Sequence, residues 1–176
     1  MRIAEKCILV SVVVLVVTGC ADTGPKTLEA PMVTRFSNGD ELVCGEPFRA
    51  PEAGDLTLVA EFPSSAAAAD GAVTGTVEVT SKRGVAGVAG PRAQAFLVRE
   101  GRVVSMPMAQ DLSGVRWDLA GGAVERLPAD AALVSCEPGG APLPPGSYEL
   151  WARLVVTPDD GPGVTSVAGP WPIEIT

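Results

Sequence analysis

The chain has 176 residues with a formal net charge of −8 at pH 7, and 47% of its residues are hydrophobic. An acidic protein that has no basic patch with interleaved aromatic residues repels nucleic-acid phosphates, which argues against a nucleic-acid partner. The sequence contains no histidine, which excludes Ser-His-Asp and Cys-His catalysis and the zinc sites that use histidine ligands.

The chain opens with the pattern of an export signal. Arg2 and Lys6 form a short basic leader, and residues 7–17 form an apolar run. A run of this length fits the hydrophobic part of a secretory signal, and it is shorter than the roughly 18 residues that cross a membrane. We therefore expect an exported protein.

Val17-Thr18-Gly19-Cys20 follows this run and resembles a bacterial lipobox, in which an aliphatic residue and two small residues precede a cysteine. The resemblance implies that residues 1–19 are a lipoprotein signal peptide, removed by cleavage before Cys20. It also implies that Cys20 carries the acyl chains, palmitate among them, that hold the protein on the extracytoplasmic face of the cell membrane. The alternative is an ordinary secretory signal whose cleavage site contains a cysteine. The composition, rich in Ala, Gly, Val, Pro, Arg and Asp, resembles that of actinobacterial proteins.

The remaining chain divides into a tether and one domain. Residues 20–31 have no apolar periodicity, and we expect a flexible lipid-anchored tether that spans about 17–20 Å on average. Residues 32–176 are long enough to bury a core as a single domain.

The four cysteines are predicted to play three different roles. Cys7 leaves with the signal and Cys20 takes the lipid, so Cys44 and Cys136 remain in an exported protein, where disulfides persist. A bridge between them would close a loop of about 92 residues and contribute about 4–5 kcal/mol in the chain-entropy model. Two free, buried thiols are the alternative.

Most of the domain has the pattern of short strands, with apolar residues at every second position and turn residues every 8–12 positions. No helix is expected: Ala66–Ala69 is too short to sustain one, and we expect the glycine-rich segment Gly84–Gly90 to be a mobile loop. Glu100-Gly101 predicts a hairpin turn. The predicted strands, taken in chain order, are residues 55–62, 72–80, 93–98, 102–106, 115–119, 123–127, 131–136, 148–156 and 173–175. This spacing predicts an all-β sandwich or barrel.

The stretch LPPGSYELWARL, residues 143–154, resembles the tyrosine corner of immunoglobulin-like domains. The resemblance implies an immunoglobulin-like β-sandwich of about 7–9 antiparallel strands, in which the Tyr148 hydroxyl bonds to backbone upstream. Leu150 stands where antibody domains have their second core cysteine. The Cys44–Cys136 bridge would therefore differ from the inter-sheet bridge of antibodies and would tie an early strand to the loop before Pro138.

Two tryptophans and two acidic pairs are candidate site residues. Trp151 and Trp171 are candidate ligand contacts if their faces are exposed, and packing under a loop or the other sheet is the alternative. The adjacent acids Asp40-Glu41 and Asp159-Asp160 could bind a hard cation, but ordinary turn chemistry explains both pairs. We therefore expect no metal, no cofactor and no catalytic residue.

These features favour a membrane-anchored extracytoplasmic lipoprotein that acts as a non-catalytic binding or scaffolding module. Its expected partners are membrane lipid, through acylated Cys20, and an extracytoplasmic protein or glycan. A carboxylate-based hydrolase is one alternative. Another is a protease-inhibitor-like module, because the turn at Pro145, Gly146 and Tyr148 is similar to that of the immunoglobulin-like intracellular protease inhibitors of bacilli.

Overall fold

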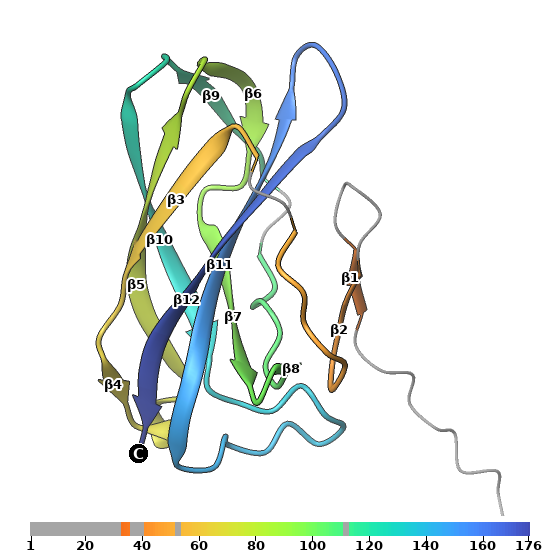
Figure 1. The fold of residues 1–176 in the computed structure, drawn as a ribbon, viewed down its shortest axis with the longest axis vertical. Helices are drawn as coiled ribbons and strands as arrows, with labels where there is room; N and C mark the ends of the chain where they lie inside the picture. Colours follow the sequence, from red (N-terminus) through yellow and green to blue (C-terminus); the bar gives the residue numbers. More distant parts are fainter. Residues whose placement is uncertain (1–32, 36–40, 52–53, 111–112) are drawn as a thin grey trace, which may run out of the picture.

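Figure 1 shows the fold in a computed structural model, which describes residues 33–35, 41–51, 54–110 and 113–176. The predicted signal peptide, lipobox and tether lie outside these residues, as does Asp40. Among the described residues, no helix has the length and apolar character needed to cross a membrane.

The predicted all-β class is confirmed. In the described part of the chain the one helical element is a single 3-10 turn, η1 (Ala68–Asp70). The strands are β1 (Val33–Arg35), β2 (Glu41–Val43), β3 (Leu56–Glu61), β4 (Ser65–Ala66), β5 (Ala72–Ser81), β6 (Val85–Ala89), β7 (Ala93–Arg99), β8 (Arg102–Val103), β9 (Val115–Leu119), β10 (Val124–Ala132), β11 (Gly146–Pro158) and β12 (Val164–Ile175). Their number exceeds the expected 7–9 because four of them are only two or three residues long.

The main sheet follows the order β3-β5-β10-β7-β11-β12-β4, and β6 and β9 extend it beside the end of β11. The sheet curls, so that β3 and β12 lie side by side although they are not hydrogen-bonded neighbours (Figure 1). Most pairings are antiparallel as expected, but β10 pairs with β7 and β12 with β4 in parallel. The sheet is therefore mixed, and its two halves face each other around a shared core.

Strand β11 shows how the sequence builds that core. Its alternate residues Tyr148, Leu150, Ala152, Leu154 and Val156 are all buried, as the period of two predicts. Ala152, Leu154 and Val156 share one buried cluster with residues of β3, β5 and β10, among them Leu58, Val77, Val79, Leu127 and Ala129. Tyr148 and Leu150 belong to a second cluster, with Val73, Leu97 and Ile173. Burial of this apolar surface is the main favourable term for the fold.

The outer face of β7 and β11 is covered as well. Residues 42–48, which we call the N-terminal strap, pack across it with Leu42 fully buried. The amide of Gly45 donates to the carbonyl of Val103 (2.8 Å), and the amide of Phe48 donates to the carbonyl of Gly101 (2.8 Å). The strap thus forms a third layer, which explains why Phe96 and Val98 are buried although they point away from the main core.

The expectation of a mobile loop at Gly84–Gly90 is wrong, because residues 85–89 form β6, which pairs with both β9 and β11. A Cβ atom on Gly87 would lie 2.3 Å from the carbonyl oxygen of Thr157. Glycine at this position therefore permits the close approach of two backbones. The glycine-rich composition of residues 84–90 does not by itself distinguish this packing role from a flexible loop.

The turn at Glu100-Gly101 is confirmed. Both residues have positive φ, 52° and 73°, as a two-residue hairpin turn of the type I′ class requires. Arg99 and Arg102 are paired across the hairpin, but their guanidinium groups find separate partners. Arg99 bonds to the Tyr148 hydroxyl, and Arg102 donates to the carbonyl of Gly45 (2.9 Å).

Candidate functional site

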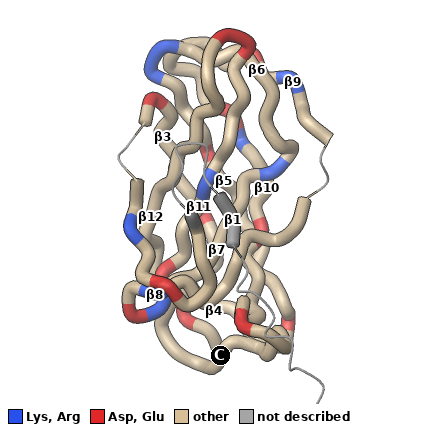
Figure 2. The backbone as a smooth tube through the Cα atoms, turned by 90° about the vertical axis from the view of Figure 1, so that its right-hand side faces the viewer, with Lys and Arg blue, Asp and Glu red and all other residues tan. Residues whose placement is uncertain are grey.

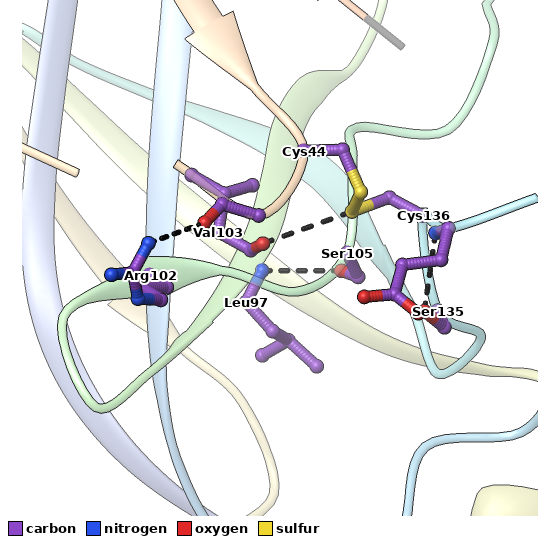
Figure 3. The surroundings of a disulfide bond; sticks show 9 residues. Cys44, Leu97, Arg102, Val103, Ser105, Ser135 and Cys136 are labelled. Atoms are coloured by element: carbon purple, nitrogen blue, oxygen red, sulfur yellow. Dashed lines mark hydrogen bonds between the residues drawn. A yellow bond between two sulfur atoms is a disulfide. The ribbon is translucent and has the colours of Figure 1, made fainter. Parts of the chain in front are cut away.

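Cys44 and Cys136 form the predicted disulfide, with a Cα–Cα distance of 5.7 Å, so the alternative of two free thiols is wrong. Figure 3 shows the bond joining the strap to the segment after β10, next to Val103 and Ser105. The amide of Cys136 donates to the carbonyl of Val104 (3.0 Å). The disulfide therefore holds the strap and this segment together at the outer face of the sheet.

Tyr148 makes the hydrogen bond that the tyrosine-corner resemblance implies. Its hydroxyl donates to the carbonyl of Pro144 (2.6 Å) and accepts from Arg99 Nη1 (3.1 Å). The Arg99 guanidinium also lies 5.1 Å from the centre of the Tyr148 ring, within the range of a cation–π contact. The buried Tyr148 side chain thus holds the first residues of β11 against the segment that precedes this strand.

Trp151 and Trp171 do not share a face. Trp151 lies half-buried on the outer side of β11, with its ring 4.8 Å from that of Phe48 in the strap. Trp171 is paired with Leu150 and packs, half-buried, against the inner core. The structure therefore does not bring the two rings together as a flat platform for a sugar.

Two of the described acids at the loop ends, Asp55 and Asp159, are held in ion pairs. Asp159 accepts two hydrogen bonds from Arg116 (2.7 and 2.5 Å), and Asp55 pairs with Arg83. Figure 2 shows charges of both signs gathered in the loops at the β6–β9 end. Within the described residues no group of three His, Cys, Asp or Glu side chains is placed to hold a metal ion. The side chains of Asp40 and Glu41 lie outside the described set.

A groove of about 550 Å³ opens on the outer face beside the disulfide. Its walls come from the start of β7, the end of β10, the middle of β11 and the segments that follow β8 and β10. Most of the lining is apolar, and the polar side chains include two carboxamides. The described lining residues are Gly71, Gln94, Met106, Pro107, Met108, Ala109, Gln110, Ala132, Val134, Ser135, Cys136 and Arg153. Sequence reasoning did not identify this site.

Arg153 is the one charged side chain in that described lining. It lies opposite Gln94 on the neighbouring strand, is 5% exposed, and donates from Nε to Gln94 Oε1. Burial lowers the pKa of Arg153 to about 10 because removal from water disfavours the charged form. The group is still protonated at neutral pH. The sequence did contain a signal that could have singled out Arg153, because it is a charged residue among the mostly apolar residues 150–156.

No protein-family model matches the sequence, and no curated protein matches it either. Among solved structures, the chain is similar to a β-glucosidase from Listeria innocua in complex with isofagomine, at 13% identity and a TM-score of 0.41, covering 80% of this chain and 17% of that one. It is also similar to the β-glucosidase EmGH1 from Erythrobacter marinus, at 15% identity and a TM-score of 0.38, over 69% of this chain and 15% of that one.

A third similar structure is the sporulation control protein Spo0M from Bacillus subtilis, at 14% identity and a TM-score of 0.35, over 69% of this chain and 49% of that one. The chain thus spans only a small part of the two glucosidases and about half of Spo0M. Similarity at this level carries no argument about function.

Proposed function

We propose that the protein is a membrane-anchored extracytoplasmic lipoprotein whose β domain is a non-catalytic binding module, with the groove beside Cys136 as its binding site. The lipobox resemblance at Cys20 supports the anchor. The observation that carries the binding site is the groove itself, a concavity of about 550 Å³ with mostly apolar walls and a few polar side chains. Mostly apolar walls with a small number of polar groups are the usual form of a small-molecule site, which favours a role in recognition.

The ion pairs at the loop ends favour binding over carboxylate-based hydrolysis. A hydrolase of that class needs two acids that converge on a substrate at a defined separation. Asp55, Asp130 and Asp159 each engage an arginine instead. The described lining of the groove contains no carboxylate, so its chemistry suits holding a ligand more than cleaving one.

The anchor is tested by Cys20→Ser. We expect this variant to lose its lipid and to move from the membrane fraction to the soluble fraction, because the acyl chains supply the membrane affinity. Fractionation of the host cells followed by intact mass analysis measures both effects. Cys7→Ser is the matched control, since Cys7 leaves with the signal peptide and the mature protein is unchanged. Retention of Cys20→Ser on the membrane would refute the anchor.

The binding site is tested by Ala109→Trp, which places an indole in the groove from an exposed lining position. We expect native mass spectrometry of the chain released from its membrane to show a co-purifying small molecule that is reduced at least about tenfold in this variant. Ala120→Trp is the control, because Ala120 is also exposed but lies in the turn between β9 and β10. Equal ligand content in all three proteins would exclude the groove.

A further inference from the structure

We propose that the protein forms a homodimer in which the free edge of β9 pairs antiparallel with the same strand of a second copy, with Trp117 on the two-fold axis. The described lining of the groove beside Cys136 shares no residue with β9, so the two sites are independent. Three features of β9 support the dimer: an open edge, the direction of its backbone groups and the arrangement of its charges.

The second edge of β9 is open. Figure 2 shows β9 at the margin of the domain, and among the described strands it pairs with β6 alone. A concavity of about 110 Å³ lies beside it, and the described lining is Val115 to Leu119 together with Glu125 of β10. Successive side chains of a strand point to opposite faces, so a concavity that all of β9 lines runs along an edge. Because β6 contributes nothing to this lining, the edge is the one that faces away from β6.

Backbone polar groups of β9 point towards this free edge. The amide of Asp159, just after β11, donates to the carbonyl of Ala86 (3.1 Å), so the polar groups of Ala86 point towards β11. Those of Gly87 point to β9, since the direction alternates along an antiparallel strand. Gly87 is paired with Trp117, whose polar groups therefore point back to β6. The two residues that flank Trp117 present their N–H and C=O groups to the free edge, and such an edge is a template for another strand.

The charges of β9 favour one register for self-pairing. Its outer face carries one exposed cation and one exposed anion, Arg116 and Asp118, on either side of buried Trp117. With Trp117 on the axis, Arg116 of each copy lies opposite Asp118 of the other, and both become hydrogen-bonded pairs of the ladder. The two neighbouring registers that keep this bonding place Arg116 opposite Arg116, or Asp118 opposite Asp118, and like charges directly opposite are destabilising.

Both charged side chains can make this contact. The Arg116 side chain is 65% exposed and gives Nη1 and Nη2 to Asp159, which leaves Nε free to donate. Among the described residues, none forms an ion pair with Asp118. Opposed Cβ atoms lie about 4.5–5.5 Å apart, within reach of an ion pair. The same register places Val115, which is 45% exposed, opposite Leu119 and removes apolar surface from water.

The test is sedimentation equilibrium of the full chain in a density-matched detergent, with micelles in excess. β9 contributes five residues from each copy, fewer than the roughly 20–30 of a standard interface. We therefore expect a weak, reversible dimer with a Kd between about 10 µM and 1 mM. The protein mass should rise from one chain to two over this range. A chain that is wholly monomeric at about 1 mM, or a mass that keeps rising beyond two chains, would overturn the inference.

Charge reversal locates the contact. Arg116→Asp places acids opposite each other in both pairs, and Asp118→Arg places arginines there, so each variant alone should dimerise at least about tenfold more weakly. An equimolar mixture of the two variants restores opposite charges in both pairs and should recover the dimer. Glu46→Arg is the matched control, because Glu46 is exposed beside β8, at the opposite end of the domain from β9 (Figure 1), and it should change nothing.

The variants also show how the inference fails. If both single variants dimerise as tightly as the unaltered chain, another surface forms the dimer. If the mixture dimerises no better than either variant, the predicted register is wrong. If Arg116→Asp does not fold, because it also loses the contact with Asp159, Asp118→Arg decides alone, and an unweakened dimer of that variant would overturn the inference.

Discussion

Replacing Cys44 and Cys136 with serine is expected to lower the free energy of unfolding by about 4–5 kcal/mol, the largest effect we predict. The two residues are 92 positions apart, and without the covalent bond the unfolded chain regains the entropy of that long loop. Urea unfolding of the oxidised protein and of the double variant, followed by tryptophan fluorescence, measures the difference.

Two single variants provide the control for the disulfide. Cys44→Ser and Cys136→Ser each break the same bond, so each should lose about as much stability as the double variant. A loss below about 1 kcal/mol in the double variant would mean that loop closure contributes little to the stability of this fold.

Phe96→Ala is expected to lower the free energy of unfolding by about 3–5 kcal/mol. The Phe96 side chain is fully buried on the outer face of β7, and its ring lies 5.1 Å from that of Phe48 in a T-shaped contact. Alanine would leave a cavity between the sheet and the N-terminal strap, because the disulfide and the hydrogen bonds of the strap limit how far it can collapse. Chemical denaturation measures the effect.

Val59→Ala is the control for Phe96→Ala, since Val59 on β3 is 50% exposed and its truncation should change stability by less than about 0.5 kcal/mol. A double-mutant cycle with Phe48→Ala should give a coupling of about 0.5–1.5 kcal/mol between the two rings. If Phe96→Ala costs less than about 1.5 kcal/mol, the outer layer is not a packed core.

Much of the fold follows from local sequence patterns. The period of two in residues 148–156 predicts which side of β11 is buried, and the structure agrees at every alternate position from Tyr148 to Val156. The Cys44–Cys136 bond could be predicted because export and cysteine count leave one economical pairing. The first of these predictions depends on residues that are close in sequence. The second depends on the small number of cysteines in the chain.

The outer layer and the groove depend on long-range packing that no local pattern specifies. The run Ala95-Phe96-Leu97-Val98 is apolar without alternation, which indicates burial on both faces. It does not say that a segment about fifty residues earlier provides the cover. Arg153 was overlooked for the same reason, since only the arrangement of β7, β10 and β11 creates the concavity around it.

The position of the disulfide also determines how the domain responds to mechanical load. A pull on the chain ahead of Cys44 passes through two sulfur atoms to Cys136, so the strands between these residues do not bear the tension. The bond keeps roughly 300 Å of extendable chain from being drawn out. A domain pulled between the chain ahead of Cys44 and the chain after Cys136 would therefore resist without unravelling the strands between the two cysteines.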